Sequence, residues 1–177
     1  VTVTGTAAGM SVSVDVVVLP ETFAMDDVVA YAGQNTAAIH YFPIPVTGTA
    51  TFEFDVVFNK LVNSTITLGD AEGNNGNCPI FGGTGDAISI QTNANGVNIR
   101  SWGTTGGAGS ADRNVTTPVV TGETYRFLIV TDIDSDTWSA IMTDKNGVQT
   151  VVADGHGYRK LVDQIDSITV LDNNSSA

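Results

Sequence analysis

Apolar and polar residues alternate with a period of two along much of this chain, and this pattern constrains its fold more than any other feature. In the stretch 51–58, Phe52, Phe54 and Val56 take one side while Glu53 and Asp55 take the other. The stretch 10–19 repeats the pattern with valines on one face and small polar residues on the other. Successive side chains of a β-strand point to opposite faces of the sheet, so each stretch predicts a strand with one buried face.

Further strand candidates recur about every 8 to 12 residues, separated by Gly, Asn, Asp and Pro clusters, which is the spacing of a sandwich or barrel. These candidates occupy 27–31, 38–42, 64–68, 87–91, 97–102, 124–131, 137–143, 149–153 and 165–171. Helical periodicity is nearly absent, with at most a turn or two expected in 155–164. The pattern predicts an all-β fold, an antiparallel β-sandwich of the jelly-roll type.

Turn residues support this prediction. Asn95-Gly96 and Asn146-Gly147 each lie between alternating runs, and both pairs accept the positive φ that a tight hairpin needs. The stretch 103–109 is rich in Gly and Thr and has no large apolar residue, so we expect a mobile surface loop there.

The length and net charge of the chain exclude several classes of protein. The 177 residues fit one domain, so we expect a single sandwich over residues 1–177. Nineteen acidic against seven basic residues give a net charge of -12, which repels nucleic acid and anionic membrane surfaces. No apolar run reaches the roughly 18 residues of a membrane span. The single cysteine, Cys78, excludes an internal disulfide framework and a four-thiolate zinc site.

The composition also suggests a compartment. Low charge density with abundant Thr, Asn, Ser and Gly is typical of secreted bacterial β-modules, so we expect an extracellular location. The chain starts at Val1 with neither an initiator Met nor a leader, and we expect it to be a piece of a larger protein.

The second half of the chain carries a series of strand and turn motifs. Gly-Glu-Thr-Tyr-Arg-Phe at 122–127 leads into Asp-Ile-Asp-Ser-Asp-Thr-Trp-Ser-Ala at 132–140, then Asp-Lys-Asn-Gly at 144–147 and Ile-Asp-Ser-Ile at 165–168. With 52–56 and 68–70, these motifs make about two thirds of the chain resemble the concanavalin-like, laminin-G-like jelly rolls that serve as carbohydrate-binding modules beside bacterial polysaccharide lyases and glycosidases. The resemblance implies a jelly roll with a polysaccharide ligand, and residues 1–45 have no counterpart in it.

Two acidic clusters carry the oxygen ligands that Ca²⁺ prefers. Their members are Asp132, Asp134 and Asp136 in one turn, and Asp70, Glu72, Asn74, Asn75 and Asn77 in another. The first cluster does not follow the EF-hand spacing, since Thr137 and Thr143 stand where that loop needs Gly and Glu. The alternative is that both are solvated turns whose side chains accept local backbone hydrogen bonds. We expect a structural Ca²⁺, with the Asp70 turn favoured because the resembling modules often carry one.

Catalytic arrangements are hard to assemble from these residues. A polysaccharide lyase needs a base and a group that neutralises the substrate carboxylate, and the candidates are His40 and Tyr41 with Arg100 or Arg126. Tyr41 is more simply a core residue of its strand. Glu53 and Asp55 have the spacing of a retaining glycosidase pair, but their face is more simply the solvent side of a strand. A Gly-x-Ser-x-Gly motif is absent, which sets aside hydrolysis by a serine nucleophile. Because these simpler interpretations are favoured, we expect no catalytic residue.

Aromatic residues favour sugar binding, because pyranose rings stack their apolar faces on aromatic rings. Trp138 and Tyr125 alternate with apolar residues and are expected in the core. Trp102 differs, because it alternates with polar residues, and we expect it to be an exposed sugar platform. Its expected polar neighbours are Gln91, Asn98, Arg100 and Arg126.

These observations predict a non-catalytic polysaccharide-binding module that targets a larger secreted enzyme or assembly to its glycan, and the net charge favours a neutral glycan. Two alternatives stay open. One is a β-jelly-roll polysaccharide lyase, and the other is a structural or adhesive domain of a cell-surface protein.

Overall fold

The computed structural model describes residues 2–7, 10–15, 36–58, 64–73, 84–92, 98–104 and 107–172, and these residues form strands and turns with no helix. The strands are β1 Thr2–Ala7, β2 Met10–Asp15, β3 Thr36–Val46, β4 Thr49–Val57, β5 Ser64–Gly69, β6 Asp86–Thr92, β7 Asn98–Thr104, β8 Gly107–Pro118, β9 Thr124–Asp132, β10 Thr137–Thr143, β11 Gln149–Gly157 and β12 Ile165–Asp172.

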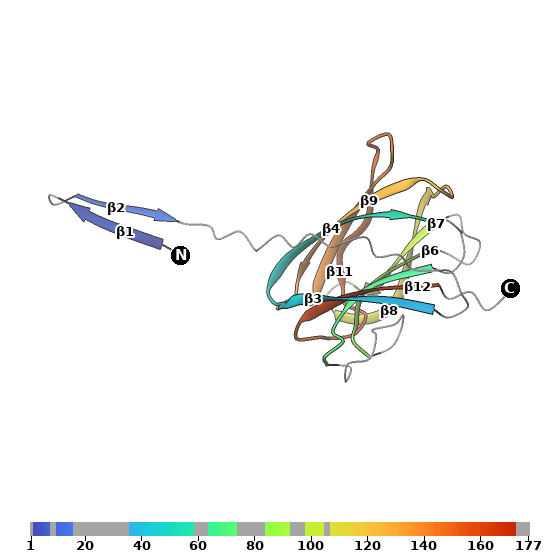
Figure 1. Ribbon diagram of the computed structural model, residues 1–177, viewed down its shortest axis with the longest axis horizontal. Coiled ribbons are helices and arrows are strands. Elements are labelled where there is room, and N and C mark those ends of the chain that lie inside the picture. The colour runs from blue at the N-terminus through green and yellow to red at the C-terminus, as the bar shows by residue number, and fades with distance from the viewer. Residues whose placement is uncertain are drawn as a thin grey trace.

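Two antiparallel sheets form the body of the molecule (Figure 1). One has four strands in the order β11-β10-β9-β4, and the other has six in the order β3-β12-β5-β6-β7-β8. The chain crosses between the sheets at β3–β4, β4–β5, β8–β9 and β11–β12, so β3 and β12 pair although they are far apart in sequence. The predicted all-β antiparallel sandwich is therefore confirmed. A third sheet holds only β1 and β2.

The core lies between the two larger sheets. Burial alternates strictly along β9 and β10, as the period of two requires. Trp138 and Tyr125 are almost completely buried, which confirms their predicted place in the core. The opposite wall of the core is aliphatic: Ile66, Leu68, Ile88 and Ile90 come from β5 and β6, and Ile165 and Ile168 from β12.

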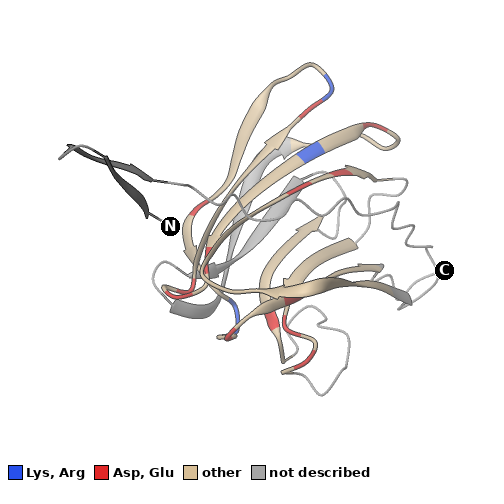
Figure 2. Cartoon of the chain, turned by 60° about the vertical axis from the view of Figure 1, so that its left-hand side comes forward, with Lys and Arg blue, Asp and Glu red and all other residues tan. Residues whose placement is uncertain are grey.

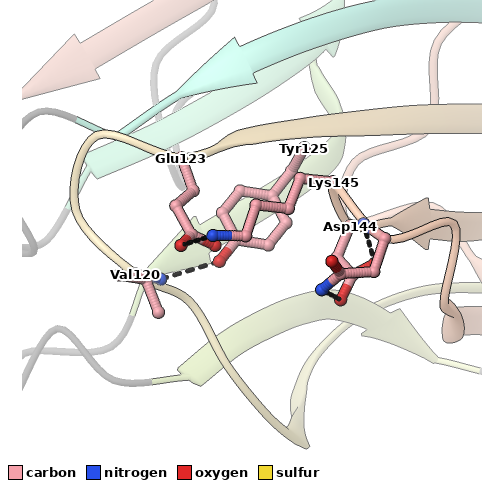
Figure 3. Close-up of polar contacts among 6 residues, drawn as sticks. Val120, Glu123, Tyr125, Asp144 and Lys145 are labelled. Atoms are coloured by element: carbon pink, nitrogen blue, oxygen red, sulfur yellow. Dashed lines mark hydrogen bonds and ion pairs between the residues drawn. The ribbon is translucent and has the colours of Figure 1, made fainter.

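Backbone geometry explains the turns between strands. Gly147 has a φ of 80°, and its N–H donates to the carbonyl oxygen of Asp144, so the predicted hairpin at Asn146-Gly147 is confirmed. Strands β6 and β7 pair as a hairpin would, although Asn95-Gly96 lies outside the described residues. At the crossing from β8 to β9, the Tyr125 hydroxyl accepts the Val120 N–H at 2.7 Å (Figure 3). That bond ties the start of β9 to the chain just before it.

Some predictions from the sequence are wrong. The short helix expected in 155–164 is absent, because β11 continues to Gly157 and the backbone N–H groups of Tyr158, Arg159 and Lys160 donate to other turns and strands. The loop expected at 103–109 falls mostly within β7 and β8, where Thr104 pairs with Gly107. Backbone pairing at the edge of a sheet needs no large apolar side chain, so the composition was misleading there. The strand predicted at 27–31 lies outside the described residues.

Candidate binding face

The six-stranded sheet turns one face toward the core. The opposite, outward face is covered at its centre, because Thr67, Ser89 and Thr169 are at most 1% exposed. Residues paired directly across antiparallel strands share a face. One cross-strand row on the outward face runs through all six strands: Ile39, Thr169, Thr67, Ser89, Trp102 and Asp112. The next row on that face is Ala37, Leu171, Thr65, Gln91, Arg100 and Asn114. The register thus brings Trp102, Arg100 and Gln91 to the same face, which we call the polar face.

Hydroxyl and amide side chains dominate the centre of the polar face. Gln91 Nε2 donates to Thr65 Oγ1 at 3.3 Å, and the Thr67 and Ser89 hydroxyls are 3.4 Å apart. The Ser89 hydroxyl also donates to Asp86. Gln91 is only 5% exposed, so its amide supports neighbouring groups and is not itself an open contact surface. The central strands therefore form a hydrogen-bonded row of buried polar side chains, and β7 extends the sheet by pairing with β6.

Tyr41 on β3 was interpreted from the sequence as a core residue, and this interpretation is wrong. Its side chain is 50% exposed, and it pairs with Ser167 on the polar face. Phe42 takes the inward position instead and stacks on Phe52 with ring centroids 5.5 Å apart. His40 pairs with Ile168, which faces the core, so His40 and Tyr41 lie on opposite faces. The alternation of side chains could have predicted this result. If Phe42 points to the core, its neighbour Tyr41 must point to the opposite face.

Arg126 lies on the other sheet, on its outer face, and the structure does not bring it near the rows that hold Trp102. Its Nε is 2.9 Å from Asp55 Oδ1 and its Nη1 is 3.4 Å from Glu53 Oε1. The hydrogen bond from Arg126 lowers the pKa of Asp55. Glu53 and Asp55 therefore form an exposed ion-pair cluster with Arg126 on the solvent side of β4.

Other described cations also face carboxylates. Lys145 pairs with Glu123 next to Tyr125 (Figure 3), and Arg159 Nε lies 3.5 Å from Asp86 Oδ2. Burial lowers the pKa of Arg159, and the Asp86 charge opposes that shift. Figure 2 shows acidic residues spread over strands and turns, with few basic ones among them. The described surface therefore offers little free positive charge to an anionic ligand.

The two predicted acidic clusters are held by groups of the protein. Asp70 Oδ1 accepts the Gly73 N–H at 2.8 Å and the Gln164 side-chain amide at 3.3 Å. Asp166 was not among the residues predicted from the sequence, yet its carboxylate lies beside this turn and accepts two of its backbone N–H groups. Asn74 lies outside the described residues. Within the described ranges, no three His, Cys, Asp or Glu side chains are grouped to hold a metal ion.

The second cluster behaves as a hydrogen-bonded turn. Asp132 Oδ2 accepts the Ser135 hydroxyl at 2.7 Å, and its Oδ1 accepts the Asp134 N–H at 3.2 Å. Asp136 has a φ of 53°, a left-handed conformation that Asp tolerates better than most residues.

The side chains of Asn98, Arg100 and Trp102 lie outside the described part of the structure, which places these residues through their backbones.

The comparisons with known proteins concern the fold. A sialidase among the solved structures matches with a TM-score of 0.55 at 12% sequence identity. The match covers 78% of this chain and 10% of the sialidase chain, so this chain is similar to a small part of a much longer protein. At that identity the likeness establishes the fold alone. No known family profile matches the chain, and no curated protein does. A helix long and apolar enough to cross a membrane does not occur among the described residues.

Proposed function

We propose that this protein is a non-catalytic module that binds a polysaccharide through the polar face of its six-stranded sheet. The observation that carries the proposal is the register of β6 and β7, in which Ser89 pairs with Trp102 and Gln91 pairs with Arg100. An aromatic ring and a guanidinium group on one face of β7 match a sugar ring, which has an apolar C–H face and hydroxyls at its edge. The buried Ser89 and Gln91 beside them support β7 and do not contact the ligand.

The shape of the polar face favours a polymer over a single sugar. Tyr41 on β3 and Trp102 on β7 are separated by three intervening strands. At about 4.8 Å between neighbouring strands, that separation is roughly 19 Å across the sheet. A ligand that contacts both aromatic residues must therefore be an extended chain that spans the covered centre of the face, whereas a monosaccharide reaches only one of them.

A binding module acts through proximity. It raises the effective concentration of whatever it is attached to at the surface of a polymeric target, even when its own affinity is weak. The match to one tenth of a sialidase chain supports such a modular context, and so does the composition, which favours a secreted protein. The pairing of the described arginines with carboxylates favours a neutral glycan.

We also propose a structural Ca²⁺ at the turn that begins at Asp70. The side-chain amide of Gln164 bonds to the carboxylates of both Asp70 and Glu72, so two carboxylates meet at this turn. Ca²⁺ requires more oxygen ligands than these carboxylates supply. The ion would therefore take further ligands from the chain after Gly73.

Retention on a panel of immobilised neutral and acidic polysaccharides tests the function. Retarded migration on one or more neutral glycans, unchanged between about 50 mM and 500 mM NaCl, is the expected result, because screening affects only charged contacts. Ultraviolet absorbance in the same mixtures reports the unsaturated products of a lyase. An increase in that absorbance would show that the protein is a lyase and not a non-catalytic binding module. Migration that no glycan affects would favour a structural domain.

A further inference from the structure

The edge of the four-stranded sheet at β4 is long and regular. β4 has 9 residues, and each of them pairs with a residue of β9 without a bulge. β4 ends the strand order of this sheet, so no described strand pairs with its other side. The backbone N–H and C=O groups that point away from the sheet at such an edge can pair with an added strand. The edge at β4 therefore has the geometry to accept one further strand.

The other edges of the two larger sheets are interrupted. β3 carries Pro43 and Pro45, and its residues 42–45 lie opposite Asp166 alone in the pairing with β12. β11 shifts its register twice against β10, and β8 shifts its register against β7. Prolines and bulges are the features by which natural proteins keep sheet edges from pairing with other chains. The sequence of β4 has no proline and its register has no shift, which distinguishes this edge from the others.

The core-facing side chains of β4 are less covered than those of β9. Phe54 pairs with Phe127, and the two rings stack with centroids 5.8 Å apart. Phe127 is fully buried, whereas Phe54 is only partly buried, and the same difference holds between Ile129 and its partner Phe52. An added strand with apolar side chains on its inward face would cover this row and remove apolar surface from water.

The outward side chains of β4 are acidic. The side chains of Glu53 and Asp55 are 56% and 48% exposed, and they share one cation, Arg126. Arg126 lies directly opposite Asp55 on β9, whereas the residue opposite Glu53 is Leu128. Oppositely charged side chains at facing positions of neighbouring strands stabilise their pairing. Basic side chains at every second position of an added strand would therefore match this edge, and the net charge of -12 disfavours a second copy of this chain there.

We propose that β4 binds an extended segment of another protein in which apolar residues alternate with Lys or Arg. The segment adds a strand next to β4 in the sheet β11-β10-β9-β4. Main-chain hydrogen bonds provide affinity in this mode of recognition, and alternate side chains provide specificity. The apolar side chains of the segment cover Phe52 and Phe54, and its basic side chains lie opposite Glu53 and Asp55. This edge belongs to the four-stranded sheet and the polar face to the six-stranded sheet, so the two binding sites can be tested separately.

Titration of the full chain with a synthetic peptide of alternating Val and Lys tests the proposal. We expect saturable binding that Glu53→Lys with Asp55→Lys weakens by about tenfold or more. Asp154→Lys with Asp163→Lys makes the same change of net charge at exposed positions elsewhere and should weaken binding far less, because salt screens distant charges. Thermal melting of each variant checks that the sandwich is folded. Equal weakening by the two double variants, or no binding to the wild type, would overturn the proposal.

Backbone methylation of the peptide tests whether it binds as a strand. Only alternate N–H groups of an added strand point toward its neighbour. Of two peptides methylated at the Val or at the Lys nitrogens, one should therefore bind and the other should not, and binding of both would overturn the proposal.

Hydrogen exchange along β4 identifies what occupies the edge. In the free chain, we expect the N–H groups of β4 that point away from β9 to exchange quickly and to become protected when the peptide binds. Protection already present in the free chain at low concentration would show that the chain covers its own edge. Protection that appears only at high protein concentration would show that a second copy covers it. Either result would overturn the proposal.

Discussion

The carboxylate of Asp166 accepts the backbone N–H of Ala71 at 2.7 Å, although the two residues are 95 positions apart in the chain. Its other oxygen accepts the N–H of Glu72 at 2.8 Å. One side chain at the start of β12 therefore fixes the turn that leaves β5, its neighbour in the sheet. Gly73 closes the same turn so tightly that a Cβ there would lie 2.1 Å from the Asp70 carboxylate.

Replacing Asp166 with Asn should destabilise the fold. The amide offers only one acceptor oxygen where the carboxylate offers two, so one backbone N–H loses its partner at a cost of about 1 to 3 kcal/mol. Urea denaturation measures the loss, and Asp163→Asn, at an exposed position on the same segment, is the control with less than about 0.5 kcal/mol expected. Equal stability of the two variants would show that the Asp166 contacts do not hold the turn.

The buried hydroxyl of Tyr158 should make the free energy of unfolding decrease at high pH. Burial raises the pKa of its hydroxyl to about 12, against the effect of its hydrogen bond with Thr131. Below pH 10 the phenol is protonated in both states. Between pH 10 and 12 the unfolded chain releases this proton while the folded chain keeps it, so the folded state loses about 2 kcal/mol by pH 12.

Denaturation curves of the wild type and Tyr158→Phe across that range measure this contribution. The variant should start about 1 kcal/mol less stable at pH 8, because it lacks the hydrogen bond, and the gap should close or reverse by pH 12. Tyr41→Phe, at an exposed position, controls for general alkaline effects. Parallel curves at all pH values would contradict a buried neutral phenol.

Removal of calcium tests the proposed metal site. Ca²⁺ at about a hundred times its dissociation constant adds roughly 2.7 kcal/mol to stability. Each kcal/mol moves the Tm of a domain of this size by about 2 to 4 °C, so a chelator should lower the Tm by about 5 to 10 °C. Asp70→Asn should abolish this response and Asp134→Asn should preserve it. The reverse result would show that the ion binds at the turn 132–136. Identical melting curves with and without chelator would show that the protein binds no structural Ca²⁺.

The alternation of side chains predicted most of the sandwich, because burial of one strand face is a local property of the sequence. The strands around Phe54, Phe127 and Trp138 follow directly from it. The edge strand β8 does not, since its Gly, Ser and Thr residues are held by backbone pairing with β7. Amino-acid composition predicts which strands bury apolar side chains. It does not predict a strand that is held mainly by main-chain hydrogen bonds to its neighbour.

The candidate site was predictable only in part, for a similar reason. The alternation placed Arg100 and Trp102 on one face of their strand, and the register agrees with this placement. It could not show that Arg126 belongs to the other sheet, because the order of strands depends on pairing between distant segments. The role of Asp166 was invisible for the same reason, since its partners lie 94 and 95 positions earlier.

Retention of Trp102→Ala on a glycan affinity gel, compared with the wild type, tests the central claim most directly. An aromatic anchor commonly carries a large share of the binding energy, so the variant should lose about 2 kcal/mol or more and migrate unretarded. Its stability should change by less than about 0.5 kcal/mol if the ring is exposed. Trp138→Ala is the matched contrast, because that buried ring should cost about 3 to 5 kcal/mol of stability. A Trp102→Ala variant that stays fully retained on the gel would contradict binding through the polar face.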